Sequence, residues 1–446
     1  MGVNCLFMKK LILFILVLLP SVGFSQKIIA EFPTTTNNVH SPKLSAIADS
    51  IYFSYSNGKS TIAYWLSGRK SRSVQAIPNL FTILPFDGEL YYYFFDQNSE
   101  SLRALKIEGE VPKEIDGEIK LEGKILGVFE DDGLNFITLK KEEKLISIIS
   151  VKRLVIESTK DFSLPNEIAE EFTTFTQTDF INNSSLLTTF LGTKDVKIYK
   201  DENIYITFDK RTVAKKNKSW VKVLKLDLAT NKSDCRNFDL EFTTQYRSFI
   251  YKKSLYAYTQ SSEKSDLKVF DLENGNLSSS STFDKTINGN VYFRSGEDKS
   301  VGKAGTFSQL LKTSGPGDPT LAVFLYESNY FIQCGTYYNQ THIGAPVSSG
   351  GPLAFLLSMV IGGVLKEAVL EDGNRKYYYI QLGADGKYTI NFNPVHPRQQ
   401  LDDYEIAESS AGKVSYKFKG YLPLGSGLVG VYKKKSESKL TLVRFD

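Results

Sequence analysis

The clearest sign of the fold lies in the stretch Leu267-Lys-Val-Phe-Asp-Leu-Glu-Asn-Gly-Asn276. Its first half alternates apolar and polar residues, as a half-buried β-strand does. Its second half, Glu-Asn-Gly-Asn, favours a tight turn, because Asn and Gly tolerate a positive φ angle. The stretch therefore predicts a strand that runs directly into a turn.

The same pattern recurs elsewhere in the 446 residues, at 102–110, 223–232 and 440–446. When the four stretches are aligned on their last apolar residue, they end at Ile107, Leu228, Leu272 and Phe445. The gaps of 121, 44 and 173 residues correspond to three, one and four units of roughly 40–44 residues. That period matches one four-stranded blade of a β-propeller.

Most of the remaining chain consists of short apolar or alternating runs separated by turn sequences such as Asp131-Asp-Gly133 and Ala384-Asp-Gly386. Long amphipathic helices are nearly absent, and aromatic residues reach 13%. We therefore expect an all-β fold, a β-propeller of about seven four-stranded blades, with six or eight also allowed. The alternative is two smaller β domains divided near Pro165, because residues 167–180 interrupt the rhythm.

The segment Val269-Phe-Asp-Leu-Glu-Asn-Gly275 resembles the blade edge of many extracytoplasmic β-propellers. The Gly-His and Trp-Asp signatures of tryptophan–aspartate repeats, the paired glycines of kelch repeats and the sialidase-type box are missing. The resemblance thus implies an architecture and no particular function.

A propeller has to close its ring. A short β-like run, Lys27–Phe32, stands near the start of the chain, and Leu440–Phe445 ends it as another. Pairing the first with the last blade would cover two strand edges that otherwise invite aggregation. We expect these two runs to lie side by side.

The N-terminal residues have the order of a secretory signal peptide: Lys9-Lys10, the apolar run Leu11–Leu19, and small residues at Gly23 and Ser25. The apolar run is shorter than the about 20 residues of a membrane span, although a retained anchor is the alternative. We therefore predict a signal peptide at 1–25 and a propeller domain at 26–446. The Phe-Ser-Gln ending resembles Bacteroidetes signals, and Asp49-Ser-Ile51 resembles the O-glycosylation acceptor of that group.

The segment 339–365 does not follow the succession of short strands and turns seen elsewhere, and we predict that it is an insertion. A Gly-, Ser- and Pro-rich loop leads into the apolar run Leu353–Leu365. The run could be a buried element, or an exposed patch that docks on a protein partner or a membrane surface. Thirteen residues of helix cover only about 20 Å, too little to span a membrane. The candidate docking residues are Phe355, Leu356, Met359 and Val360.

A second candidate binding segment is polar and carries an imidazole, a guanidinium and three carboxylates. Its residues are His396, Arg398, Asp402, Asp403, Tyr404 and Glu405. Paired carboxylates can cleave glycosides, but Asp402 and Asp403 would point to opposite faces of a strand. A solvated loop is the competing interpretation. Tyrosines at 91–93, 337–338 and 377–379 could stack on sugars or belong to the core.

Other chemistry is sparse. The three histidines and the missing Cys-x-x-Cys and His-Glu-x-x-His patterns exclude a histidine-rich metal site, and no cofactor motif is present. Cys235 and Cys334 could form a disulfide or remain buried thiols. The formal charge of +4, or +2 without residues 1–25, gives no field to attract nucleic acid.

These observations predict an exported, non-catalytic binding or scaffold protein of a bacterial cell envelope, periplasmic or at the surface, with no cofactor. We expect an envelope protein as its partner, recognised through propeller loops. The alternative is a carbohydrate-binding or carbohydrate-active propeller. We expect no nucleic acid partner and no membrane span in the mature chain, while residues 353–365 could make a peripheral membrane contact.

Overall fold

The computed structural model describes residues 26–445 apart from short connecting segments and the three longer stretches 183–194, 338–374 and 392–415. The chain forms two compact units, one built from both chain ends and one from residues 38–395. The predicted signal peptide at 1–25 lies outside the described residues. Within the described part, no helix has the length and apolarity that crossing a membrane requires.

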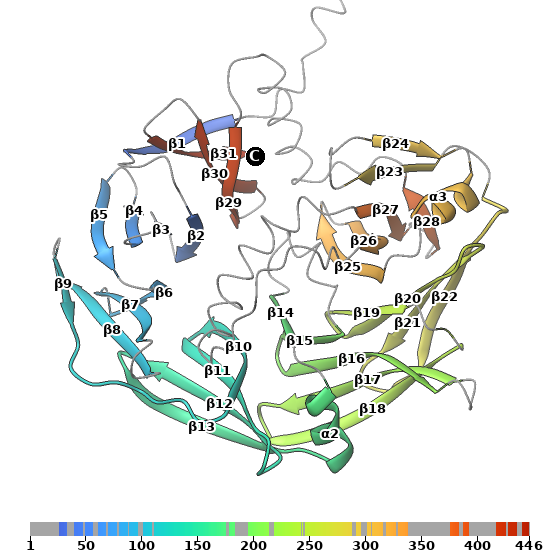
Figure 1. The fold of residues 1–446 in the computed structure, drawn as a ribbon, viewed down its shortest axis with the longest axis horizontal. Coiled ribbons are helices and arrows are strands. Elements are labelled where there is room, and N and C mark those ends of the chain that lie inside the picture. Colours follow the sequence, from blue (N-terminus) through green and yellow to red (C-terminus); the bar gives the residue numbers. More distant parts are fainter. Residues whose placement is uncertain are drawn as a thin grey trace, which may run out of the picture. The chain divides into compact units, whose positions relative to one another are not determined.

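The unit of residues 38–395 holds six sheets in chain order, the blades of a β-propeller, and nearly all of their strand pairs are antiparallel (Figure 1). Blade 1 contains β2 (His40–Ile47), β3 (Ser50–Ser56), β4 (Thr61–Ser67) and β5 (Lys70–Ile77). Blade 2 contains β6 (Leu80–Phe86), β7 (Glu89–Asp96), β8 (Ser101–Glu108) and β9 (Val111–Glu114). Blade 3 contains β10 (Lys124–Asp131), β11 (Gly133–Lys140), β12 (Leu145–Lys152) and β13 (Val155–Ser163).

Blades 4 and 6 are larger than the others. Blade 4 contains β14 (Thr178–Asn182), which pairs in parallel with its neighbour, β15 (Val196–Lys200), β16 (Ile204–Val213), β17 (Lys218–Asp227) and β18 (Lys232–Leu240). Blade 5 contains β19 (Tyr246–Tyr251), β20 (Ser254–Gln260), β21 (Ser265–Asp271) and β22 (Leu277–Phe283). Blade 6 contains β23 (Val291–Ser295), β24 (Val301–Ala304), β25 (Asp318–Tyr326), β26 (Asn329–Tyr337), β27 (Arg375–Leu382) and β28 (Tyr388–Asn391).

The other unit is a four-stranded sheet made from both ends of the chain. Its strand order is β1 (Gln26–Pro33), β31 (Lys439–Phe445), β30 (Gly427–Lys434) and β29 (Tyr416–Leu424). β1 pairs antiparallel with β31, and Phe32 lies opposite Leu440. The predicted pairing of the first run with the last is therefore confirmed.

The propeller prediction is likewise confirmed, and six blades fall within the range expected from the sequence. The alternative of two domains divided near Pro165 is wrong. A single buried cluster joins Phe162 and Leu164, before that proline, to Ile168, Val196 and other residues after it. Within the interruption at 167–180, the described residues belong to helix α2 (Asn166–Thr174) and to the start of β14.

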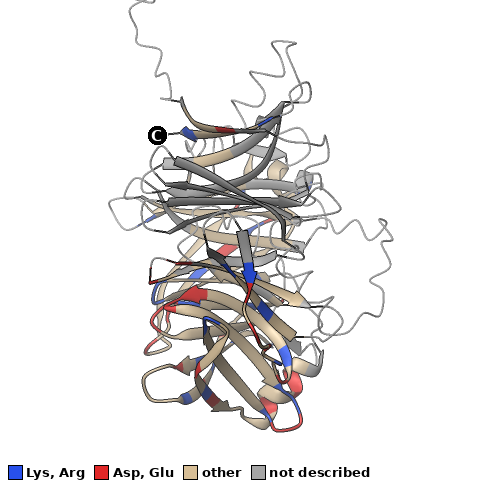
Figure 2. Ribbon diagram, turned by 90° about the vertical axis from the view of Figure 1, so that its left-hand side faces the viewer, with Lys and Arg blue, Asp and Glu red and all other residues tan. Residues whose placement is uncertain are grey.

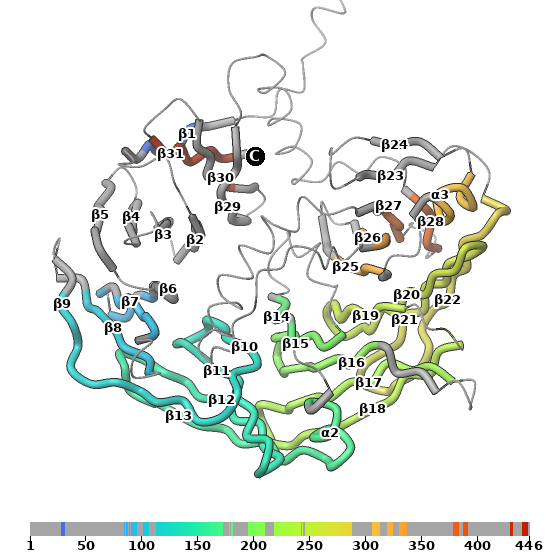
Figure 3. Tube along the Cα trace, in the orientation of Figure 1, coloured from blue at the N-terminus to red at the C-terminus, as the bar shows by residue number. Residues whose placement is uncertain are grey.

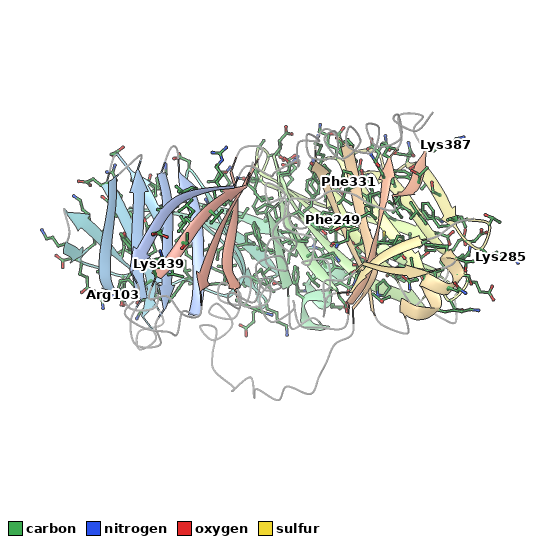
Figure 4. All side chains as sticks on the ribbon, turned by 90° about the horizontal axis from the view of Figure 1, so that it is seen from above. Arg103, Phe249, Lys285, Phe331, Lys387 and Lys439 are labelled. Atoms are coloured by element: carbon green, nitrogen blue, oxygen red, sulfur yellow. The ribbon has the colours of Figure 1, made fainter. Side chains whose placement is uncertain are left out.

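Apolar side chains from neighbouring blades share the core. One cluster joins Tyr93 and Phe95 of blade 2 to Phe136 of blade 3, and another joins Phe249 of blade 5 to Ile332 of blade 6. Helix α3 (Phe307–Ser314) contributes to the second cluster. Phe249 and Phe331 lie inside this unit, whereas Lys285 projects at its edge (Figure 4). Blades are thus held together by side chains, because successive sheets bury apolar faces against each other.

The strand-and-turn motif has a defined geometry. The Asp271 carboxylate accepts hydrogen bonds from the backbone N–H groups of Glu273 (2.7 Å) and Asn274 (3.0 Å), and Gly275 adopts a φ of 79°. The preceding blade repeats it: Asp227 accepts from the N–H groups of Ala229 and Thr230, and Asn231 adopts a φ of 54°. The motif is therefore an aspartate-stabilised turn that ends in a left-handed residue, either Gly or Asn.

Candidate binding face

The hairpin turns of blades 2 to 5 lie on one face of the residue 38–395 unit, beside Tyr330 and Tyr388 of blade 6, and we call this surface the turn face. It consists of Asp87, the turns at 131–133, 153–154, 201–203, 228–231, 252–253 and 272–276, and the two tyrosines. In blades 2, 3 and 5 these turns join the first strand to the second or the third to the fourth. They lie on one face because successive strands of a blade alternate in direction. Figure 3 traces the path from β10 to β22 through these blades.

Polar contacts of turn and outer-strand residues run from blade to blade along this face. Asp87 of blade 2 is ion-paired with Arg153 of blade 3. Lys160 Nζ of blade 3 donates to the Leu228 carbonyl of blade 4 at 2.7 Å. Arg236 Nη1 of blade 4 donates to the Glu273 carbonyl of blade 5 at 2.8 Å. The turn face is thus one continuous surface rather than a set of separate loops.

A pocket of about 320 Å³ opens between blades 3 and 4 at the turn face; we call it the blade 3–4 pocket. It forms where the Asp131-Asp132-Gly133 turn ends β10, where Gly133 has a φ of 139°. A Cβ at Gly133 would stand 3.1 Å from the Val151 carbonyl oxygen, so this turn requires glycine. The lining residues are Phe129, Asp131, Asp132, Asn135, Ile148, Ser150, Lys152, Glu157, Ser158, Lys160, Lys200 and Leu228.

The charged groups of this pocket neutralise one another. Lys152 Nζ lies 2.6 Å from an Asp132 oxygen, and Lys200 Nζ lies 3.7 Å from an Asp131 oxygen. Lys200 Nζ also lies 5.6 Å from the centre of the Phe129 ring. That ring stacks on Phe180 of β14, with centroids 5.9 Å apart. The Phe129–Phe180 pair and the Lys200–Asp131 ion pair therefore hold the pocket across the blade boundary, while the Lys152–Asp132 ion pair lies within blade 3.

A tyrosine cluster lies at the other end of the turn face, between blades 5 and 6. The rings of Tyr251 and Tyr330 meet edge to face at 5.9 Å, and Lys252 Nζ lies 5.8 and 5.3 Å from their centres. Lys252 Nζ also donates to the Tyr330 hydroxyl at 3.0 Å, which raises the pKa of this lysine. Burial raises the pKa of Tyr251. The cluster offers an aromatic surface with a protonated amine, a combination suited to recognition.

A buried ionic cluster lies at the far end of β15 and β16, away from the turn face. Lys197 is ion-paired with Asp209, and both side chains are fully buried. Ser248 of β19 donates from its backbone N–H (3.0 Å) and its hydroxyl (2.5 Å) to Asp209, and Arg247 Nη1 donates to Asp195 at 2.7 Å. Burial lowers the pKa of Lys197, while Asp209 opposes that shift. The cluster joins blade 4 to blade 5 and has no access to solvent at its centre.

The ten site residues predicted from the sequence lie outside the described residues. Phe355, Leu356, Met359 and Val360 fall in 338–374, and His396, Arg398, Asp402, Asp403, Tyr404 and Glu405 fall in 392–415. Their docking and polar roles stay predictions. The predicted insertion at 339–365 lies within 338–374 and is therefore also outside the described residues.

The tyrosines at 91–93 and 378–379 do not provide a sugar-binding edge, while the side chains of the tyrosines at 337, 338 and 377 lie outside the described part. Tyr91, Tyr92 and Tyr93 are 5%, 1% and 0% exposed, and Tyr378 and Tyr379 are 2% and 8% exposed. Tyr378 instead shares a buried hydrogen bond with the Tyr258 hydroxyl at 2.8 Å across blades 5 and 6. These five tyrosines belong to the core because a central strand between two packed blades buries both of its faces.

Cys235 and Cys334 are free thiols, which settles the two possibilities left open by the sequence. Cys334 is buried and Cys235 is half-buried. Among the described residues, no group of three or more His, Cys, Asp or Glu side chains is arranged to hold a metal ion. Figure 2 shows Lys and Arg interspersed with Asp and Glu along the described ribbon.

The turn face was not predicted as a site, because its contacts join distant parts of the sequence. Lys160 and Leu228 are 68 residues apart, and Lys252 and Tyr330 are 78 residues apart. The turns themselves could be recognised, and Asp131-Asp-Gly133 was predicted as one. Locally, only the adjacent Tyr251-Lys252-Lys253 in a hairpin turn could have drawn attention to an aromatic and basic surface.

Comparison with known proteins identifies no family and no curated relative from which a function could be inferred. No family model matches the sequence, and no curated protein is similar to it. Among solved structures, the chain is similar to the β-propeller domain of the Trilobed protease from Pyrococcus furiosus, at 9% identity and a TM-score of 0.35, covering 91% of this chain and 95% of that one. It is also similar to the Dos1 propeller, at 9% identity and a TM-score of 0.34, covering 94% and 95%.

A third similar structure is the WD40 domain of SCAP from fission yeast, at 8% identity and a TM-score of 0.32, covering 93% of this chain and 97% of that one. Identities and TM-scores of this size assign neither a family nor an activity. Function has to be argued from the residues of this chain.

Proposed function

We propose that this protein is a non-catalytic binding protein that recognises a protein partner through the turn face. The observation that carries the proposal is the unbroken series of polar contacts that crosses each blade boundary from blade 2 to blade 6. A surface held by such contacts keeps its shape when a partner binds, so less conformational entropy is lost on association. Its paired charges suit recognition of a complementary surface.

The compartment is part of the same proposal. The order of charges, apolar run and small residues in 1–25 supports export, and the Bacteroidetes-like ending supports a bacterial envelope. Expression in a bacterial host followed by cell fractionation and mass spectrometry of the N-terminus tests this. We expect an envelope protein that begins near Gln26. Recovery of the intact N-terminus in the cytoplasmic fraction would contradict it.

Partner recognition is tested with two lysine variants on opposite faces. Lys252→Glu reverses a charge on the turn face, whereas Lys141→Glu makes the same change in the β11–β12 turn on the opposite face. Both lysines are exposed turn residues. We expect envelope proteins cross-linked to the wild-type chain to be lost with Lys252→Glu and kept with Lys141→Glu. Equal recovery with both variants would rule out the turn face.

Glycan binding is the second candidate, and the blade 3–4 pocket is the observation that favours it. Its volume of about 320 Å³ lies at the small end of the range of about 300–1,000 Å³ for small-molecule sites. It combines an aromatic ring with hydroxyl, amide and carboxylate groups, which together contact both the C–H and the O–H groups of a sugar.

A further inference from the structure

We infer that the blade 3–4 pocket binds a neutral sugar residue, either free or as a unit of a glycan. This inference rests on the proposed binding function, because it assigns a ligand to part of the same turn face. Three properties of the pocket lead to it: its size, its charge balance and the mixture of groups in its lining.

The size of the pocket fits a single small ring. About 320 Å³ is too small for a folded segment of another protein and close to the lower limit of small-molecule sites. The pocket is bounded by two blades that contact each other beside it, since Lys160 donates to the Leu228 carbonyl and Ser233 of β18 donates to the Ser163 carbonyl of β13. A larger ligand would have to separate these blades.

The charge balance selects a neutral ligand. The lining holds three lysines and three carboxylates: Lys152, Lys160 and Lys200 with Asp131, Asp132 and Glu157. Each lysine already has a partner, because Lys152 pairs with Asp132, Lys160 donates to a carbonyl, and Lys200 donates to the Asp201 carbonyl at 2.5 Å. An ionic ligand would have to break these interactions and would meet charges of both signs.

A neutral polyhydroxylated ring does not face that penalty. Its hydroxyl groups can accept hydrogen bonds from the ammonium groups and donate to the carboxylates while the ion pairs persist. Asn135, Ser150 and Ser158 add uncharged polar groups to the lining. Phe129, Ile148 and Leu228 add apolar atoms that can contact the C–H groups of the ring.

A metal ion is a poorer occupant of this pocket. Asp131, Asp132 and Glu157 belong to the described residues, among which no group of three carboxylates, histidines or cysteines is arranged to bind a metal. The nearby lysines would also repel a divalent cation. The geometry therefore favours an uncharged organic ligand.

The test uses a pair of matched serine variants in the full mature chain. Ser158→Trp places an indole in the pocket from the exposed outer strand of blade 3, and Ser280→Trp places one on the exposed outer strand of blade 5, away from the pocket. Isothermal titration calorimetry is carried out with neutral mono- and oligosaccharides of glucose, mannose and galactose, and with polyuronates as charged probes.

We expect a neutral saccharide to bind with 1:1 stoichiometry, to bind about tenfold or more weakly to Ser158→Trp, and to bind unchanged to Ser280→Trp. The affinity should hold between about 0.05 and about 0.5 M salt, because no net charge is neutralised. Binding only of polyuronates, binding that Ser158→Trp leaves intact, or no binding of any saccharide would overturn the inference. If capture of the protein partner still depends on Lys252, such a result rejects the sugar ligand and leaves the proposed function standing.

Discussion

Two turns show how one backbone geometry is encoded by different residues. Asp227 and Asp271 each accept hydrogen bonds from two backbone N–H groups, and the residue four positions later adopts a positive φ. That residue is Asn231 in blade 4 and Gly275 in blade 5. The hydrogen bonds from Thr230 and Ala229 lower the pKa of Asp227, so the turn depends on an ionised carboxylate. The motif is degenerate in sequence because only the aspartate and a left-handed residue are required.

The positive φ angle of Gly275 leads to a prediction about the stability of the fold. Gly275→Ala should lower the free energy of unfolding by about 1–2 kcal/mol, because alanine is strained at a φ of 79°. A Cβ there would also lie 3.1 Å from Arg236 Cδ. The matched variant Asn231→Gly should leave stability unchanged or slightly raised. Urea unfolding followed by circular dichroism measures both, and equal losses in the two variants would contradict this explanation.

The two thiols should differ in reactivity. Burial raises the pKa of Cys235 to about 11, so only about 0.1% of it is thiolate at pH 8. Cys334 is fully buried, which raises the pKa of its thiol as well. Iodoacetamide should therefore label Cys235 slowly at pH 8 and faster as the pH approaches 11, and Cys334 only after unfolding. Mass spectrometry of the modified peptides checks this, and rapid labelling of Cys235 at pH 8 would show that its thiol is not shielded.

At the scale of strands, neighbouring blades are held by polar as well as apolar contacts. β15 and β16 supply Lys197 and Asp209, and β19 supplies the two Ser248 hydrogen bonds to Asp209. Each polar group of this kind costs free energy on burial unless it is paired. The cluster thus specifies that β19 of blade 5 faces blade 4. Apolar contacts alone would select that strand less strictly, because they do not require particular partner atoms.

Removing one member of this cluster should be costly. Lys197→Met leaves the Asp209 carboxylate buried without its cation, and we expect a loss of about 3–5 kcal/mol in the free energy of unfolding. The double variant Lys197→Met, Asp209→Asn should recover part of that loss, because the uncompensated charge is gone. Chemical denaturation of the three proteins provides the comparison. A loss below about 1 kcal/mol for Lys197→Met would mean that the pair adds little stability.

At the scale of the whole molecule, the sequence predicted the strand-and-turn motif and the pairing of the chain ends, because each depends on local alternation or on a short turn motif. The predicted spacing of three units between Ile107 and Leu228 is wrong, since these residues belong to blades 2 and 4 and the blades between them are longer than the assumed period. The tyrosine trios show the limit of that reasoning: burial of both strand faces depends on the neighbouring blade, which a single strand does not reveal. The contacts of the turn face were missed for the same reason, since residues such as Lys252 and Tyr330 meet only through tertiary packing. Blade 4 also contains a strand, β14, that pairs in parallel, and no repeat pattern in the sequence indicated it.

The pairing of the chain ends predicts an effect of truncation. A chain that begins at Thr34 lacks β1 and leaves the edge of β31 without its partner strand. We expect this chain to aggregate and to unfold at a lower temperature than a chain that begins at Gln26, because an uncovered edge strand pairs with other molecules. Size-exclusion chromatography and thermal unfolding measure the difference. Identical behaviour of the two chains would show that β1 is dispensable.

The strand pair β1–β31 also sets an order of events during biosynthesis. β1 ends at Pro33 and β31 begins at Lys439, so β1 is synthesised long before its partner strand. Contacts between such distant segments form slowly, because chain entropy opposes their meeting. β1 therefore stays unpaired until β31 has been made, and the sheet of β1, β31, β30 and β29 cannot be completed before then. In a circular permutant that connects residue 445 to residue 26, β31 and β1 would be synthesised one directly after the other and could pair as soon as both are made.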